Sequence, residues 1–468
     1  MISLLYLLIV PLLGLIALLV NRREKRISDM FLLLLVFIVD SALFFVGIIV
    51  GFSTFNLMLV PSIDFAFSLG ITGISLPFLL LAVALPALGL VSLYDEIKDD
   101  RNLFSIVYLI SYLSLIGVFV STNLLSFFIF WEFILVAFFF VIAFWGEEER
   151  RRIASMKFLI FTQFGSLTLL AAFILLFIYT GSFNLITIQS ASSSLPAFIA
   201  QVCFFLVLVT ALIKMPIFPF HSWLPDAHVT APTAGSILLA GVLLKMGGYA
   251  LIQFGVLLFP SVVRSFQVPL LILGIFTTIY ITLVASAQKD LKKIIAYSSI
   301  FYMSLAFIGA VSLSNLGLDG AIFLMVSHGF IAGMLFALAG ILKEKTGTRL
   351  INELGGLAKN LPMFAFFIMF SVIATLGVPG LSNFIGELVV FFGSYQVYPF
   401  VLLALIGALV ATFYYTNAAK LMLFSAQNKK FSGVTDISTL EMLQLGLFSV
   451  FILVLGILPG ILFGGITL

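Results

Sequence analysis

The chain is dominated by apolar stretches of about twenty residues, the length at which a helix crosses a lipid bilayer. Hydrophobic residues make up 62% of its 468 residues and charged residues only 9%, whereas ordinary soluble domains are about 25% charged. The sequence therefore predicts an all-α polytopic membrane protein.

The apolar stretches predict about fourteen transmembrane helices, with ends placed to within about 2–4 residues. The first stretch has no cleavage-like site after it, so we expect a retained helix and not a signal peptide. The predicted helices cover residues 2–20, 29–50, 71–93, 103–120, 123–145, 153–179, 197–220, 232–258, 266–286, 292–312, 317–341, 361–395, 396–424 and 439–462.

Lysine and arginine gather in every second loop between these stretches, and Arg264 is the exception in the other loops. Loops rich in lysine and arginine stay in the cytoplasm. We therefore expect a multi-pass protein of the cytoplasmic or inner cell membrane with both termini on the outer side. The basic loop residues are Arg22, Arg23, Lys25, Arg26, Lys98, Arg101, Arg150, Arg151, Arg152, Lys289, Lys292, Lys293, Lys343, Lys345, Arg349, Lys359, Lys429 and Lys430.

Two of the predicted helices contain helix-breaking residues, at Lys214–Pro219 and at Leu376–Gly380. Broken helices in corresponding positions of two repeats mark a transport path in many transporters. We expect three N-terminal helices in 1–102, a first five-helix repeat in 103–258, an inverted second repeat in 259–424 and a last helix in 425–468. The alternative is two independent proline kinks.

Among the charged residues inside the apolar stretches, we single out four: Glu132, Lys214, Lys245 and Glu387. A charged side chain at bilayer depth costs at least about 2.5–3.5 kcal/mol. Such residues persist when they face the bundle interior, pair with one another and move ions or protons. We interpret them as a proton-conducting axis, and purely structural salt bridges are the alternative.

Each charge has an expected role on this axis. Glu132 would keep Lys214 charged when the two are close, and Lys214 would release its proton when Glu132 withdraws. Lys245 would exchange protons in mid-helix, and Glu387 would store a proton beyond the second break. His328 has the chemistry of a proton relay, although a lone helical histidine is more often structural. Hydroxyl groups that could order water nearby belong to Ser298, Ser299, Ser327 and Thr375.

Other polar residues are given plainer interpretations. His221 and His228 are expected in a loop that plugs the cytoplasmic mouth, not in a metal site, because their spacing does not suit one helix face. Asp40 either contacts a partner subunit or faces lipid in protonated form. Lys420 can snorkel to the membrane surface or stand at the end of the path. The run 147–152, together with Lys157, is expected to be a solvated loop.

No cofactor site is predicted in this chain. Cys203 is the only cysteine, which excludes an intramolecular disulfide and a cysteine-ligated cluster, and we expect it to be inert packing. No glycine-rich nucleotide loop or nucleophile triad is present, so the chain has no visible redox site, metal site or nucleic-acid partner.

The stretch from Lys214 to Tyr249 closely resembles the signature of the antiporter-like subunits of respiratory complex I. Supporting matches are Trp131-Glu132, residues 157–163, 290–299 and 377–380, so that the resemblance covers most of the chain. It implies the fourteen-helix fold of that family with inverted repeats. It also implies the family's proton axis on Glu132, Lys214, Lys245 and Glu387. Where the family often has a histidine in helix 292–312, this chain has Tyr302, whose phenol can still hydrogen-bond water.

The resemblance favours the M type of complex I subunit, because Glu387 replaces the lysine usual in the L and N types, and the chain stops soon after its last helix. It implies that the chain assembles with other membrane subunits, contacts lipids and moves protons (or sodium ions). Quinone, iron–sulfur clusters and flavin would be held by the partner subunits. An assembly driven by a hydrogenase or a multi-subunit cation/proton antiporter is the main alternative. A stand-alone solute carrier and a non-conducting structural subunit are two others.

Overall fold

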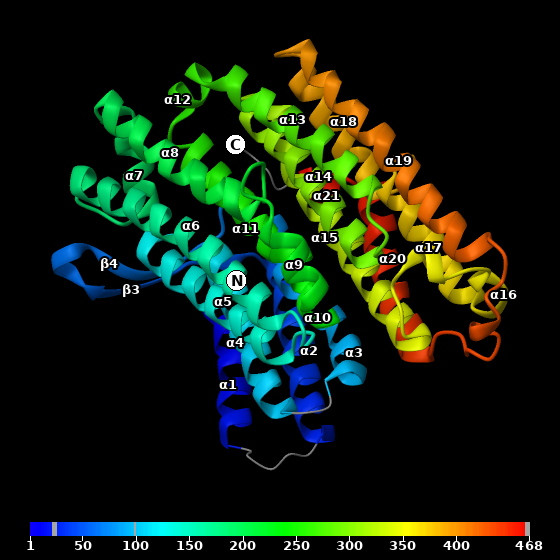
Figure 1. The fold of residues 1–468 in the computed structure, drawn as a ribbon. Helices are drawn as coiled ribbons and strands as arrows, with labels where there is room; N and C mark the ends of the chain where they lie inside the picture. The colour runs from blue at the N-terminus through cyan, green and yellow to red at the C-terminus, as the bar shows by residue number, and fades with distance from the viewer. Residues whose placement is uncertain (21–25, 98–99, 464–468) are drawn as a thin grey trace.

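The computed structural model describes residues 1–20, 26–97 and 100–463, and long helices packed side by side make up almost all of it (Figure 1). The prediction of an all-α polytopic protein is confirmed. Within these ranges, twelve helices are long and apolar enough to cross a membrane. Two shorter apolar helices, Tyr6–Val20 and Pro362–Thr375, fall in the first and twelfth predicted spans, so the total of fourteen stays a prediction.

Two small sheets, which the sequence analysis did not anticipate, lie at the end of the N-terminal helices. Strand β1 (Ile2–Ser3) pairs in parallel with β2 (Phe52–Ser53), which places the start of the chain beside the end of α2 (Arg26–Val50). Strands β3 (Phe55–Val60) and β4 (Phe65–Leu69) form an antiparallel hairpin around the turn η1 (Pro61–Ile63). The hairpin projects sideways from the bundle in Figure 1.

The N-terminal helices α1 (Tyr6–Val20), α2 and α3 (Ser75–Glu96) pack against one another and against α4 (Arg101–Val120). Asp40 on α2 is 0% exposed and lies against Tyr112 of α4, whose ring packs edge-on on Phe37. Both interpretations of Asp40, as a contact to a partner and as a lipid-facing acid, are therefore wrong. Neighbouring helices of the same chain cover the carboxyl group.

The first half of the bundle follows α4. Asn123 begins α5, because its side chain accepts hydrogen bonds from the backbone of Leu125 and Ser126. The elements are α5 (Leu124–Trp145), α6 (Arg151–Thr180), α7 (Leu185–Ala191), η2 (Ser192–Ser194), α8 (Ala197–Lys214), α9 (Trp223–Thr230), α10 (Thr233–Leu238), η3 (Leu239–Leu243), α11 (Leu244–Ala250), η4 (Leu251–Val256) and α12 (Pro260–Ser265).

The second half begins after α12. Asp290 caps α14 and Ser438 forms a capping box at the start of α20. The elements are α13 (Gln267–Ser286), α14 (Leu291–Val311), α15 (Asn315–Thr346), η5 (Ile351–Glu353), α16 (Leu357–Asn360), α17 (Pro362–Thr375), α18 (Ser382–Tyr395), η6 (Pro399–Ala404), α19 (Leu405–Ala419), η7 (Lys420–Phe424), η8 (Lys429–Phe431), α20 (Thr439–Ile457) and α21 (Gly460–Phe463).

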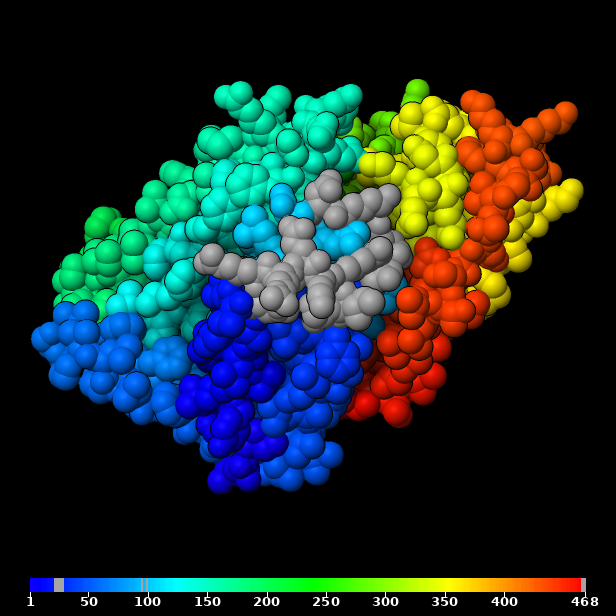
Figure 2. Space-filling model, turned by 90° about the horizontal axis from the view of Figure 1, so that it is seen from below, coloured from blue at the N-terminus to red at the C-terminus, as the bar shows by residue number. Residues whose placement is uncertain are grey.

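The centre of the protein is built from helices of both halves. The apolar windows of Thr233–Val256 and Asn315–Thr346 are wholly buried, and α14 is nearly so. Seen from below in Figure 2, the N-terminal helices and the first half lie on one side of an elongated body, and the second half lies on the other. The residue boundaries proposed for the four segments stay predictions.

Both predicted helix interruptions are present. Helix α8 ends at Lys214 and α9 begins at Trp223, while α17 ends at Thr375 and α18 begins at Ser382. A further irregularity was not predicted: η3 and η4 are π-helical turns on either side of the short helix α11. The span predicted as one uniform helix, 232–258, therefore contains two π-helical segments.

Ion pairs join the loops at one end of the bundle. Glu147 pairs with Lys343 and Arg349, and Arg349 also pairs with Asp290. We call the end that carries Lys292, Lys343 and Arg349 the basic end. Four basic residues used for the predicted orientation, Arg22, Arg23, Lys25 and Lys98, lie outside the described residues.

Candidate functional site

Lys214 is the last residue of α8, directly before the first break, and it is 1% exposed. Its ammonium lies 5.0 Å from the centre of the Trp131 ring on α5, and the indole nitrogen of Trp131 donates to Ser166 at 3.0 Å. Lys214 interacts electrostatically with Glu132, but Lys214 Nζ and Glu132 Oε1 have no hydrogen-bond partner among the described residues. The two predicted partners are thus neighbours without a direct hydrogen bond.

Lys245 lies on α11 between the two π-helical turns and is 0% exposed. Its ammonium donates a hydrogen bond to the carbonyl oxygen of Ala240, five residues earlier in the same helix. Gly247 lets this helix approach α8, since a Cβ at that position would lie 2.7 Å from Lys214 Cβ. The two buried lysines therefore sit on helices in very close contact.

His328 lies in the middle of α15 and is 1% exposed. Neither ring nitrogen has a hydrogen-bond partner within the described part of the chain, and the ring stacks on Tyr302 with centroids 4.6 Å apart. His328 interacts electrostatically with Lys245 and with His228, as expected from the packing of α15 against η3 and α11. The structure thus brings His328 to the middle of the predicted axis, where an imidazole can take up or donate a proton at either nitrogen.

His228 is a candidate residue that the sequence analysis misjudged. The stretch expected to be a loop is the short helix α9, and His228 on it is 0% exposed. Its ring stacks on Phe336 with centroids 4.3 Å apart, and its nitrogens have no hydrogen-bond partner in the described structure. Lys245 and Lys292 both interact with it electrostatically. The mostly apolar run around it, from Trp223 to Thr230, was the signal in the sequence.

Glu387 lies on α18, just past the second break, and is half-buried. The turn of the break lies against it, since a Cβ on Gly377 would lie 3.1 Å from Glu387 Oε2. The carboxylate lines a cavity of about 250 Å³ together with Tyr302 and the exposed Leu409 of α19. Glu387 therefore stands between the buried interior and the outer surface of the second half.

Polar side chains surround the second break. Ser327, next to His328, contacts both the Ser382 hydroxyl and the Asn383 side-chain oxygen at 2.7 Å. Tyr302 donates to the carbonyl oxygen of Thr375, which the end of α17 leaves without a helical partner. Of the other predicted hydroxyl groups, Ser298 shares a hydrogen bond of 2.6 Å with Tyr415, and Ser299 donates to the carbonyl oxygen of Ile295.

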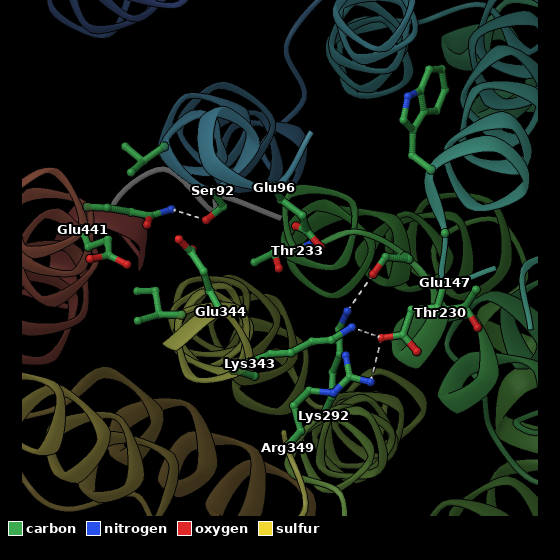
Figure 3. A pocket seen from close by; sticks show the side chains of 18 of the residues that line it. Ser92, Glu96, Glu147, Thr230, Thr233, Lys292, Lys343, Glu344, Arg349 and Glu441 are labelled. Atoms are coloured by element: carbon green, nitrogen blue, oxygen red, sulfur yellow. Dashed lines mark hydrogen bonds and ion pairs between the residues drawn. The ribbon is translucent and has the colours of Figure 1, made fainter. Parts of the chain in front are cut away.

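A polar pocket of about 420 Å³ opens at the basic end between the two halves (Figure 3). Lys343 and Arg349 point across it toward Glu147, with ion-pair distances of 2.5 and 2.9 Å. Burial favours a raised pKa for Glu147, but the hydrogen bond from Lys343 and the charge of Arg349 outweigh it and lower that pKa below 4.5. The prediction of a solvated loop at 147–152 missed this connection.

Three other residues considered in the sequence analysis are Lys157, Lys420 and Cys203. Lys157, which was expected to belong with the solvated loop 147–152, pairs with Asp226 at 2.7 Å and so connects α6 to α9. Lys420 is exposed on η7. Cys203 is buried, as expected of a packing residue.

Comparison with known proteins identifies the family. The protein-family model described as the transmembrane region of NADH:quinone oxidoreductase/Mrp antiporter proteins matches residues 121–413. The NADH-quinone oxidoreductase subunit M of Rickettsia felis is 36% identical over 402 residues, which cover 86% of this chain and 81% of that protein. The F(420)H(2) dehydrogenase subunit M of Methanosarcina mazei is 37% identical over 421 residues, with 86% and 82% covered.

Solved structures share the fold. A chain of respiratory complex I from Thermus thermophilus with bound NADH superimposes with a TM-score of 0.90 at 28% identity, over 99% of this chain and 97% of that one. A chain of the archaeal membrane-bound sulfane sulfur reductase superimposes with a TM-score of 0.88 at 22% identity, over 97% and 76%. The protein is thus a multi-pass membrane protein that belongs to the NADH:quinone oxidoreductase/Mrp antiporter family of transmembrane subunits.

Proposed function

We propose that the chain is a proton-translocating membrane subunit of a redox-driven, complex I-like quinone oxidoreductase. One observation carries the proposal: Lys214 and Lys245 are both buried, and neither has a carboxylate within ion-pair distance in the described structure. A permanently charged lysine at that depth would be costly, whereas a lysine that alternates between charged and neutral states suits a proton path. The names of the relatives in Rickettsia and Methanosarcina support the same function.

The proposed axis runs from Glu132 through Lys214 and Lys245 to His328 and Glu387. Glu132 is close enough to stabilise a charged Lys214 but is not hydrogen-bonded to it, so a small movement of α5 or α8 changes which group holds the proton. Tyr302 lies between the two residues at the other end, since it stacks on His328 and interacts with Glu387.

The orientation of the chain in the membrane and its partner subunits are part of the same proposal. The basic end would face the cytoplasm under the positive-inside rule, with both termini outside. The chain would work beside other membrane subunits, and the quinone, the iron–sulfur clusters and the flavin would belong to those partners and not to this chain. Glu132 and Glu387 are half-buried on opposite halves of the bundle, which suits contact with neighbouring subunits.

A second candidate is an ion-translocating subunit of a membrane-bound hydrogenase or a multi-subunit cation/proton antiporter. The fold also suits it, because a chain of the Mrp complex from Dietzia superimposes with a TM-score of 0.86 at 22% identity, over 99% of this chain and 51% of that one. Purification of the native complex and identification of its other subunits would separate the two candidates.

The test of proton transfer uses Lys245 in the reconstituted complex. Lys245→Ala removes the ionisable group, and Lys245→Arg keeps the charge on a side chain that does not release its proton. We expect both variants to lose most proton pumping per electron, while Lys420→Arg, at an exposed position, pumps as the wild type does. Full pumping by Lys245→Arg would show that the group is a fixed charge and would refute the axis.

A further inference from the structure

The polar pocket at the basic end reaches inward to Lys292, a residue outside the proposed axis (Figure 3). Lys292 lies in the first turn of α14 and is 3% exposed, whereas its neighbour Lys293 is half-buried. The pocket also contains Glu96 and Glu147, and both interact electrostatically with Lys292. A polar cavity of this size has room for several water molecules between the carboxylates and the ammonium group.

Lys292 connects the pocket to α9. Its ammonium donates a hydrogen bond of 2.6 Å to the carbonyl oxygen of Ala231, in the gap between α9 and α10. His228 lies on α9 three residues before Ala231, and both Lys292 and Lys245 interact with its ring electrostatically. Lys292 thus lines a polar pocket and interacts electrostatically with His228, whose ring nitrogens have no hydrogen-bond partner among the described residues.

The positive charges around His228 oppose simultaneous protonation of all the buried basic residues there. Lys292, Lys245, His228 and His328 are cations when protonated, and all four are buried. In a desolvated region each positive charge disfavours protonation of its neighbours. A proton taken up at Lys292 therefore promotes the release of one further along.

We propose that Lys292 is a further proton-carrying residue, which takes up protons from the pocket and passes them through His228 toward Lys245. In the transfer, an N–H bond of the Lys292 ammonium breaks as an N–H bond forms on the imidazole, directly or through water. The imidazolium then releases the proton of its other ring nitrogen toward Lys245. A proton from the aqueous phase, relayed by water in the pocket, protonates the neutral Lys292 again. This inference rests on the proposed function.

A structural role is the competing explanation, in which Lys292 only satisfies the carbonyl oxygen of Ala231. An arginine can make the same hydrogen bond and carry the same charge, but it does not release its proton. The test therefore compares Lys292→Arg with Lys293→Arg, the matched change one position along, in the complete complex reconstituted in vesicles. We expect at least a tenfold loss of protons pumped per electron in Lys292→Arg and wild-type pumping in Lys293→Arg. Wild-type pumping by Lys292→Arg would overturn the inference.

A second experiment distinguishes loss of a transferable proton at position 292 from a change in the shape of the side chain. In a Cys203→Ser background, Lys292→Cys is alkylated with 2-bromoethylamine, which forms a thioether amine and releases bromide. A parallel sample is alkylated with (2-bromoethyl)trimethylammonium, which carries a permanent charge and no transferable proton. We expect pumping to return only with the primary amine. With both adducts verified by mass spectrometry, equal recovery from both reagents or recovery from neither would overturn the inference.

The same assay distinguishes this inference from the proposed function. If Lys245→Ala abolishes pumping while Lys292→Arg pumps normally, the axis stands and protons enter it elsewhere. If both variants pump normally, the proposed function itself fails.

Discussion

The close approach of α11 to α8 at Gly247 gives a prediction about how exactly Lys214 must be placed. A Cβ at Gly247 would lie 2.7 Å from Lys214 Cβ and 3.0 Å from the backbone nitrogen of Met215. Carbon atoms prefer separations of about 3.5–4.0 Å, so Gly247→Ala would push α8 and α11 apart by up to about 1 Å. No flexible side-chain end can absorb the shift, because both contacts involve atoms at or next to the backbone.

The magnitude follows from two opposing terms. Overpacking of a buried site costs about 1–3 kcal/mol, and replacing a helical glycine by alanine returns about 0.5–1 kcal/mol. We therefore expect Gly247→Ala to lower stability by about 0–2.5 kcal/mol. Displacing a reacting group by about 1 Å can cost up to about a hundredfold in rate. Because Lys214 is on the proposed axis, we expect the rate of proton pumping to fall even where the folded complex remains stable.

Gly255→Ala is the matched control on the same membrane span. A Cβ there would meet Leu251 and Val207 side-chain atoms at 3.5 Å, which is ordinary contact. We expect this variant to be as stable as the wild type and to pump normally. The measurements are thermal unfolding of the purified complex and protons pumped per electron in vesicles. If Gly247→Ala matches Gly255→Ala in both, close packing does not position Lys214.

Three further outcomes are expected. Glu132→Gln should reduce proton pumping far more than electron transfer, measured in an intact reconstituted complex; unchanged pumping would remove Glu132 from the switch. Glu387→Asp should keep partial pumping and Glu387→Gln should lose most of it, with assembly checked; full pumping by the glutamine variant would mean that protons leave elsewhere. Glu147→Gln should destabilise the contact to Lys343 and Arg349 by at most about 1 kcal/mol. Because the folded-state pKa of Glu147 is lowered, that stabilisation is complete above pH 4.5 and is lost as the pH falls through the lower value. Unfolding curves of wild type and variant should therefore converge in acid, and a constant difference at all pH values would contradict the assignment.

The sequence predicted the features that depend on residues close to one another along the chain. Apolar length predicted an all-α polytopic protein, and Pro216 and Gly377 marked breaks that the structure has. The burial of Lys214 and Lys245 followed from the apolar residues around them. These conclusions needed only the cost of moving charge and unpaired backbone groups into a bilayer.

Features that depend on contacts between distant segments were not predictable in this way. His228 was assigned to the loop after the predicted helix 197–220, and only the packing of α15 shows that Phe336 covers its ring. Glu147 looked like a solvated charge, since its partners Lys343 and Arg349 lie about two hundred residues later in the chain. Asp40 gave no sign that α4 would cover it.

The α-helical winding that carries Lys245 makes this span sensitive to length. Successive residues of an α-helix are about 100° apart around its axis, so deletion of Leu244, at the start of α11, would turn every later residue of that helix by about that angle. Lys245 would then face a different neighbour, and Gly247 would no longer lie against Lys214. The hydrophobicity of the span would hardly change. Among homologous chains, a gain or loss of one residue here should therefore be rarer than exchange of one apolar side chain for another.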